Sequence, residues 1–302
     1  MSEMEYINSF EVNGKNYAMR AAMYGKNILH NWDFRNPVNQ RVADKYDNVA
    51  NAIYMLDRWQ SNITNAIGNF EIVNDAFRVT KVSGGNVGIR QILEFGHLYY
   101  GKEVTLSAEI DNRIFNSTLI VPFPSDTNVW LAKEIINGWL LDILVVPSGT
   151  VFFRLYSLSH LPNGSYIDIQ AVKLELGPAS TLANDPPMDF GRELAVCQRY
   201  FQSLNPMNVP LTGVRMTNFT ANTVNFFIPL QQTIRIVPTI TSTSDSPFFV
   251  VNPNNTNTNE FTFSVGGAIR ANGLLITATR NNHGLTDAAL NINPGTFLEA
   301  NL

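Results

Sequence analysis

Short stretches in which apolar residues alternate with polar ones, separated by turn-forming residues, recur along the chain from Asn27 onward. Residues 104–110 are the clearest case, with Val, Leu, Ala and Ile at every second position. Successive side chains of a strand point to opposite faces, so this alternation predicts a strand with one buried face. Turn residues recur at 83–85, 124–126 and 162–165. Many short strands at this spacing predict an all-β fold that begins with a jelly-roll β-sandwich.

The stretch 166–176 changes phase partway along. Its apolar residues occupy odd-numbered positions up to Ala171 and even-numbered positions from Val172 onward. A slip of one residue is what a β-bulge produces, so we expect a bulge at this point. Residues 49–56 are ambiguous, because Val49, Ile53 and Leu56 have helical spacing within a segment that also fits a strand.

A turn-rich segment without strand periodicity covers residues 177–187. In the residues after it, Leu194, Cys197 and Phe201 are spaced to lie on one face of a short amphipathic helix. The segments 224–230, 261–265 and 274–278 then alternate again, and residues 252–259 read as a polar loop. The predicted fold is therefore an N-terminal jelly-roll β-sandwich, a short linker helix and a C-terminal β-sandwich domain.

The same signals set the expected domain boundaries. We expect an attachment segment at residues 1–26, a jelly-roll domain at 27–178, a linker with a short helix at 179–203, and a C-terminal β domain at 204–302.

Charge and composition exclude several kinds of partner. Charged residues make up 15% of the chain and the formal net charge is −4, so no general basic field favours nucleic acid. The start of the chain, Met1 to Glu5, is acidic and lacks the apolar core of a secretory signal. The most apolar run, residues 139–146, is much shorter than the roughly 20 residues that cross a bilayer. We expect no nucleic-acid partner and no membrane insertion.

No catalytic constellation emerges from the residue types and their spacing. The single cysteine, Cys197, sits in an apolar segment typical of a buried residue, and the histidines lack metal-ligand spacing. The glycine-rich stretch 83–88 lacks the Gly-Lys-Ser/Thr that holds phosphates, and there is no Gly-x-Ser-x-Gly elbow. We expect no enzyme activity, no cofactor and no metal site.

Several segments together resemble phage and prophage tail-fibre-like proteins, in which a jelly roll similar to carbohydrate-binding modules precedes a small C-terminal β domain. The first two segments are residues 27–41 and 54–59, and residues 172–177 followed by 193–201 resemble the closing strand and linker. Residues 233–240 resemble a strand that ends in an Arg-x-x-Pro turn. One departure is that Val42 follows the Gln-Arg pair where that family often has glycine, so the first turn is expected to be built differently.

This resemblance implies a structural or receptor-binding subunit of a phage or prophage tail-like fibre. It would attach to the virion, contact other virion or tail proteins, form a homo-oligomer (a trimer in many such fibres), and touch host surface polysaccharide. A purely structural head-fibre, collar or decoration protein is the alternative, and a glycan depolymerase is a further one.

The candidate carbohydrate-binding residues are Trp32, Asp57, Arg58 and Trp59. An indole face stacks on a sugar ring, and a neighbouring carboxylate and guanidinium bond to its hydroxyls. Tryptophan beside apolar strand residues also commonly fills a sandwich core, and Asp57 with Arg58 also fits a structural ion pair, so both interpretations stay open.

Overall fold

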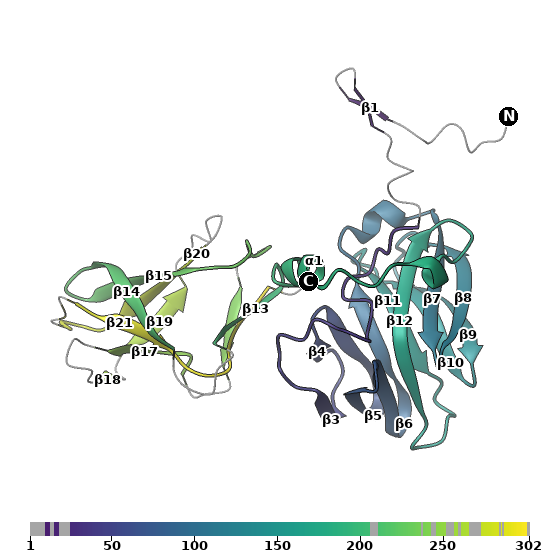
Figure 1. The fold of residues 1–302 in the computed structure, drawn as a ribbon, viewed down its shortest axis with the longest axis horizontal. Helices are drawn as coiled ribbons and strands as arrows, with labels where there is room; N and C mark the ends of the chain where they lie inside the picture. Colours follow the sequence, from purple (N-terminus) through teal and green to yellow (C-terminus); the bar gives the residue numbers. More distant parts are fainter. Residues whose placement is uncertain are drawn as a thin grey trace. The chain divides into compact units, whose positions relative to one another are not determined.

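The computed structural model describes residues 10–12, 15–17, 25–205, 211–236, 238–242, 246–251, 257–258, 261–265, 273–283, 285 and 287–300. Over these residues the protein is all-β, with a single short α-helix (Figure 1). The chain divides into two compact units after Phe190, inside the predicted linker, and the loop Asn39–Val42 groups with the second unit. Most of the predicted attachment segment, residues 1–26, lies outside the described residues, apart from residues 25–26 and the antiparallel pair of β1 (Phe10–Val12) and β2 (Lys15–Tyr17).

The N-terminal unit is a jelly-roll-like β-sandwich around one hydrophobic core. Its elements are β3 (Lys45–Val49), β4 (Tyr54–Leu56), β5 (Trp59–Val73), β6 (Ala76–Ile92), the 3-10 helix η2 (Gly96–Tyr99), β7 (Glu103–Ile110), β8 (Arg113–Ile120), β9 (Val129–Ile136), β10 (Trp139–Val145), β11 (Val151–Ser157), β12 (Tyr166–Leu176) and the 3-10 helix η3 (Leu182–Asn184).

The long strands β5 and β6 pair along their length and run through both layers of the sandwich. The first half of β6 pairs with β12 and its second half pairs with β11, which gives the strand order β8-β7-β12-β6-β11-β10-β9. The change of layer occurs where the β5–β6 register shifts at Ile67/Gly68. Nearby Gly84 has a φ of +78°, and a Cβ there would lie 2.2 Å from the Asn65 carbonyl oxygen. Only glycine fits this close crossing.

Alternation along the strands places the core as the sequence predicts. In β7 the side chains of Val104, Leu106, Ala108 and Ile110 are all buried. The predicted bulge in β12 is confirmed, because its register against β7 shifts between Ile169 and Ala171. After the bulge, Val172 and Leu174 lie in the core, and Lys173 and Glu175 turn to the opposite face.

The C-terminal unit forms a second sandwich-like arrangement of strands. Within it β14 pairs with β21 near its start and with β15 near its end, and so joins the two halves of the larger sheet. The elements after η3 are α1 (Phe190–Cys197), β13 (Phe201–Asn205), β14 (Leu211–Phe219), β15 (Thr223–Pro229), β16 (Thr239–Ser242), β17 (Phe248–Val251), β18 (Asn257–Thr258), β19 (Thr262–Val265), β20 (Gly273–Thr279), β21 (Ala289–Ile292) and β22 (Thr296–Glu299).

The predicted helix is present but shorter than its apolar pattern suggests. It ends at Cys197, which is buried, and Phe201 does not lie on it. Instead Phe201 begins β13, pairs with Glu299 of β22 and stacks on Phe297 with ring centroids 5.1 Å apart. The placement of Phe201 on the helix was wrong, because Phe201 pairs with β22 and its ring is buried there.

Other segments resolve as follows. Residues 49–56 are not helical, since β3 ends at Val49 and β4 begins at Tyr54 after a turn. Residues 233–236 do not form a strand, and β16 starts after Pro238. The predicted polar loop 252–259 lies outside the described residues except for β18.

Candidate binding cleft

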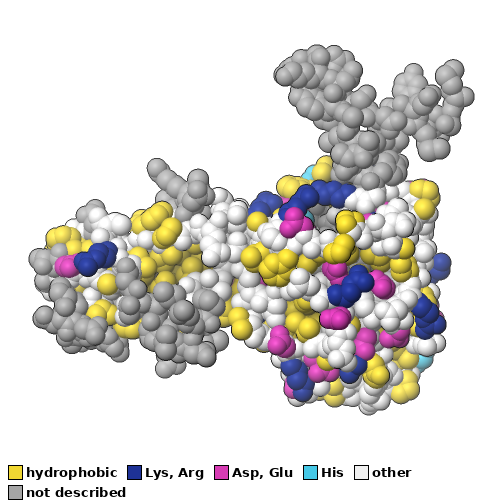
Figure 2. All heavy atoms as spheres, viewed as in Figure 1, with side chains coloured by type: hydrophobic (Ala, Val, Ile, Leu, Met, Phe, Trp, Pro, Cys, Tyr) yellow, Lys and Arg dark blue, Asp and Glu magenta, His cyan; other side chains and the backbone are white. Residues whose placement is uncertain are grey.

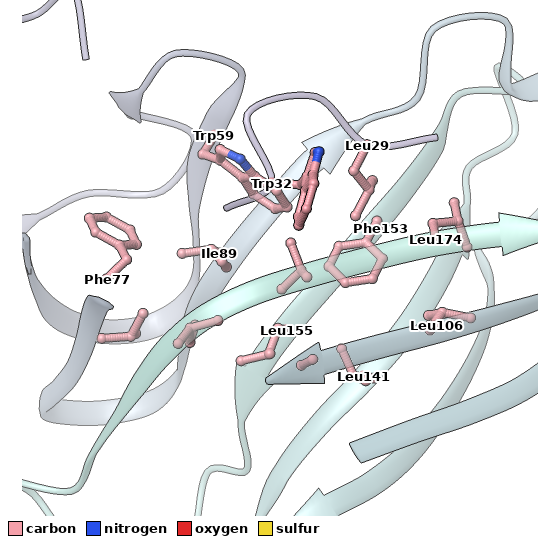
Figure 3. Packing of buried hydrophobic residues seen from close by; sticks show 14 of the residues in the cluster. Leu29, Trp32, Trp59, Phe77, Ile89, Leu106, Leu141, Phe153, Leu155 and Leu174 are labelled. Carbon is pink, nitrogen blue, oxygen red and sulfur yellow. The ribbon is translucent and has the colours of Figure 1, made fainter. Parts of the chain in front are cut away.

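The predicted binding residues lie together, but inside the N-terminal domain. Trp59 is completely buried and Trp32 is 8% exposed. Figure 3 shows both indoles among core side chains that include Phe153 and Leu29. The Trp59 ring meets Phe34 and Phe153 edge to face, and its Nε1 donates a 2.7 Å hydrogen bond to the Asn31 carbonyl oxygen. Neither tryptophan offers an open face on which a sugar ring could stack.

The neighbouring polar pair is buried as well. Asp57 and Arg58 are 1% and 3% exposed. The Asp57 carbonyl oxygen accepts a hydrogen bond from the Asn31 amide, while the Arg58 Nη2 donates to the carbonyl oxygen of Ile92 at 2.9 Å. These contacts hold the loop that precedes β5 against the end of β6, so Asp57 and Arg58 stabilise the fold in this structure.

An open cleft of about 470 Å³ lies elsewhere on the same domain, on the outer face of one layer. Five strands contribute to that face, in the order β5, β6, β11, β10 and β9. The cleft is lined by Asn62, Thr64, Asn86, Asn128, Trp130, Leu144, Arg154 and Tyr156.

Strand alternation explains which side chains reach this cleft. In β11, Phe153 and Leu155 point into the core, so Arg154 and Tyr156 point outward. Cross-strand pairing then aligns outward residues from separate strands: Arg154 lies opposite Asp142, and Leu144 lies opposite Trp130.

Gly88 brings β6 close to β11 beside the cleft. A Cβ at this glycine would lie 2.4 Å from the Cα of Tyr156, its cross-strand partner. The absence of a side chain at Gly88 therefore permits this close pairing and leaves the Tyr156 side of the cleft open.

The positive charge of Arg154 in the cleft is compensated by a buried carboxylate, that of Asp142. The Asp142 side chain is completely buried and accepts two hydrogen bonds from the Arg154 guanidinium, with the Nε bond at 2.7 Å. Burial raises the pKa of the Asp142 carboxyl, and the bonds from Arg154 oppose that shift. The Tyr156 hydroxyl lies 3.3 Å from the same carboxylate. Burial and then the Asp142 charge raise the Tyr156 pKa to about 12, so its phenol is protonated at neutral pH.

Trp130 is the exposed aromatic of the cleft. Its side chain is on β9 and the residue is 59% exposed, whereas Trp32, Trp59 and Trp139 are each 8% exposed or less. An indole next to amide, hydroxyl and guanidinium groups is a chemically suitable surface for a polyhydroxylated ring: the indole stacks on C–H faces while the polar groups bond to hydroxyls. On the face shown in Figure 2, basic and acidic side chains of this domain are interspersed.

The sequence did not single out Trp130 or its neighbours. A weak signal existed, since residues 128–134 combine a tryptophan with polar and charged residues and so describe a strand with an exposed side. The lining residues, however, come from strands widely separated in the chain, and only their register brings them together.

Among the described residues, no group of three or more His, Cys, Asp or Glu side chains could hold a metal ion. Nor does any helix in the described part have the length and apolar character needed to span a membrane. Comparison of the chain with protein-family models, curated proteins and solved structures gives no match.

Proposed function

We propose that the protein is a glycan-binding subunit of a phage or prophage tail-like fibre, and that its N-terminal domain binds the sugar in the cleft around Trp130. The observation that carries the binding proposal is the exposed indole of Trp130 beside the amides and hydroxyls of the cleft. The virion assignment is supported by the resemblance of the sequence segments to tail-fibre-like proteins.

The charge balance supports a neutral glycan as the ligand. Arg154 is the only charged side chain among the lining residues, and its charge is compensated by the buried Asp142. An anionic sugar would therefore meet no uncompensated cation among the side chains that line the cleft. The remaining lining groups are amides, hydroxyls, Leu144 and the indole, which suit hydroxyls and C–H faces.

A glycan array of neutral and uronic-acid-containing bacterial polysaccharides tests this proposal. The wild-type protein should bind neutral glycans saturably, and Trp130→Ala should reduce affinity at least tenfold, which corresponds to about 1.4 kcal/mol. Tyr166→Ala is the matched control, because Tyr166 is 56% exposed and lies on β12 rather than at the cleft. It should leave binding unchanged.

Two results would contradict the proposal. Equal loss of binding in both variants would show that the cleft is not the site. The absence of binding to any glycan in the wild type would favour a purely structural virion component.

A further inference from the structure

A fully buried lysine lies in contact with two carboxylates on the outer face of the other layer. Lys173 Nζ lies 2.5 Å from Asp185 Oδ1 and 3.6 Å from Glu175 Oε2. The exposed fractions of these three side chains are 0% for Lys173, 1% for Glu175 and 14% for Asp185. The Nζ atom also lies 2.7 Å from both the Gly25 carbonyl oxygen and Thr181 Oγ1.

The bulge in β12 and the segment after it create this enclosed polar site. Because Val172 and Leu174 turn into the core, Lys173 and Glu175 turn to the opposite face of the strand. The segment from Gly177 to Asp185 folds back over that face. It is held by the bond from Thr105 Oγ1 to the Gly177 carbonyl oxygen, and by the bond between the hydroxyls of Ser107 and Ser180. Water is therefore largely excluded from the lysine and its partners.

Thr181 links the amine to Glu175. Its hydroxyl accepts a hydrogen bond from Lys173 Nζ and donates one of 2.8 Å to Glu175 Oε2. Its backbone N–H donates to the other oxygen of Glu175, also at 2.8 Å. The carboxylate of Glu175 is thus fixed in orientation, with a direct hydrogen-bonded path for a proton from the amine.

We propose that Lys173 and Asp185 condense to an intramolecular amide bond, with Glu175 as the proton-transferring group. The amine nitrogen is already held against the acceptor carboxyl, which removes most of the entropic barrier to reaction. Amide formation requires the amine in its neutral form and the carboxyl as the acid. A proton that moves from the Lys173 ammonium to Asp185 produces the neutral pair.

The reaction then balances without any further reagent. The N–H groups of the neutral amine are held by Gly25 and Thr181, so its lone pair is free to attack Cγ of Asp185. The C–N bond forms, and the excess proton on nitrogen passes to Glu175 through the Thr181 hydroxyl. Glu175 returns a proton to the departing hydroxyl of Asp185, the C–O bond breaks, and one water molecule leaves. Glu175 accepts one proton and returns one, so it ends as the carboxylate with which it began.

The product would tie the segment after the sandwich covalently to β12. This segment otherwise depends on hydrogen bonds to the face of the strand, and it leads into α1. The cross-link would hold it in place when the chain is unfolded or pulled.

Intact-mass spectrometry of the full-length denatured chain tests the proposal. The wild-type mass should be lower than the sequence mass by one water molecule. Tryptic digestion should give a branched peptide that joins residues 173 and 185, with no cleavage after Lys173. Asp185→Ala and Lys173→Met should each show the full mass of their own sequences.

Glu175→Gln separates the chemistry from the fold. It keeps a hydrogen-bonding side chain of the same shape but cannot accept the proton, so the folded variant should stay uncross-linked. A wild-type chain of full mass, with separate peptides for residues 173 and 185, would overturn the proposal. A Glu175→Gln variant that cross-links as fully as wild type would overturn the role of Glu175.

Discussion

Arg154 on β11 donates two hydrogen bonds to the carboxylate of Asp142, which lies directly opposite it on β10 and is completely buried. Asp142→Asn removes the negative charge and leaves the Arg154 guanidinium, only 16% exposed, without its counter-charge. The free energy of unfolding should fall by about 3 kcal/mol, the usual cost of breaking a buried ion pair. Urea denaturation measures this change.

The matched control for this substitution is Asp168→Asn. Arg78 and Asp168 form the same two-bond pair between neighbouring strands, but their side chains are 27% and 21% exposed. Solvent screens this pair, so the loss should be no more than about 1 kcal/mol. Equal losses in the two variants would show that burial does not set the strength of the Asp142 pair.

The raised pKa of Tyr156 makes stability depend on pH in the alkaline range. Because the pKa is about 12 in the folded protein, the contribution of the protonated phenol is fully present below the ordinary tyrosine pKa of about 10. It is lost as the pH rises through about 12, by an amount on the order of 2 kcal/mol. Tyr156→Phe lacks the titrating group, so its stability relative to wild type should rise across this window. A stability difference that stays constant with pH would contradict the shift.

Val42 adopts a left-handed backbone conformation, with φ at +61°, and is 68% exposed. A β-branched side chain is strained there, whereas glycine is not. Val42→Gly should therefore raise the free energy of unfolding by about 1 kcal/mol, because the relieved strain exceeds the added flexibility of the unfolded chain. Val42→Ala keeps a Cβ and should gain less. If alanine stabilises as much as glycine, backbone strain is not the cause.

Truncation of Trp59 should lower the free energy of unfolding far more than truncation of Trp130. Trp59→Ala removes a fully buried ring and the hydrogen bond that its Nε1 donates to the Asn31 carbonyl oxygen, so it should cost about 3 to 5 kcal/mol. Trp130→Ala removes a mostly exposed ring and should change stability by less than about 0.5 kcal/mol. Thermal unfolding of the two variants distinguishes these outcomes, and a strongly destabilised Trp130→Ala would show that the indole is part of the fold.

The sequence predicts more of the fold than of the cleft. Alternation places β7 and β15, and the phase change in β12 predicts its bulge, because these signals are local to one strand. Phe201 was misplaced because pairing with a strand almost a hundred residues later decides its environment. Trp59 was one of four candidate binding residues, yet tryptophan suits core packing as well as binding. The neighbours of Trp130 in space depend on the register among β9, β10 and β11, which no single segment encodes.

Quenching of tryptophan fluorescence by acrylamide tests the cleft most directly, because Trp130 is the exposed member of the chain's four tryptophans. A neutral glycan that binds in the cleft should protect the quenchable fraction of the emission, saturably and with the affinity measured by titration. Trp130→Phe should lack that fraction, and the glycan should not alter its quenching. Protection in the wild type is the expected result. Unchanged quenching while a glycan is bound would contradict it, since the ligand would then lie away from Trp130.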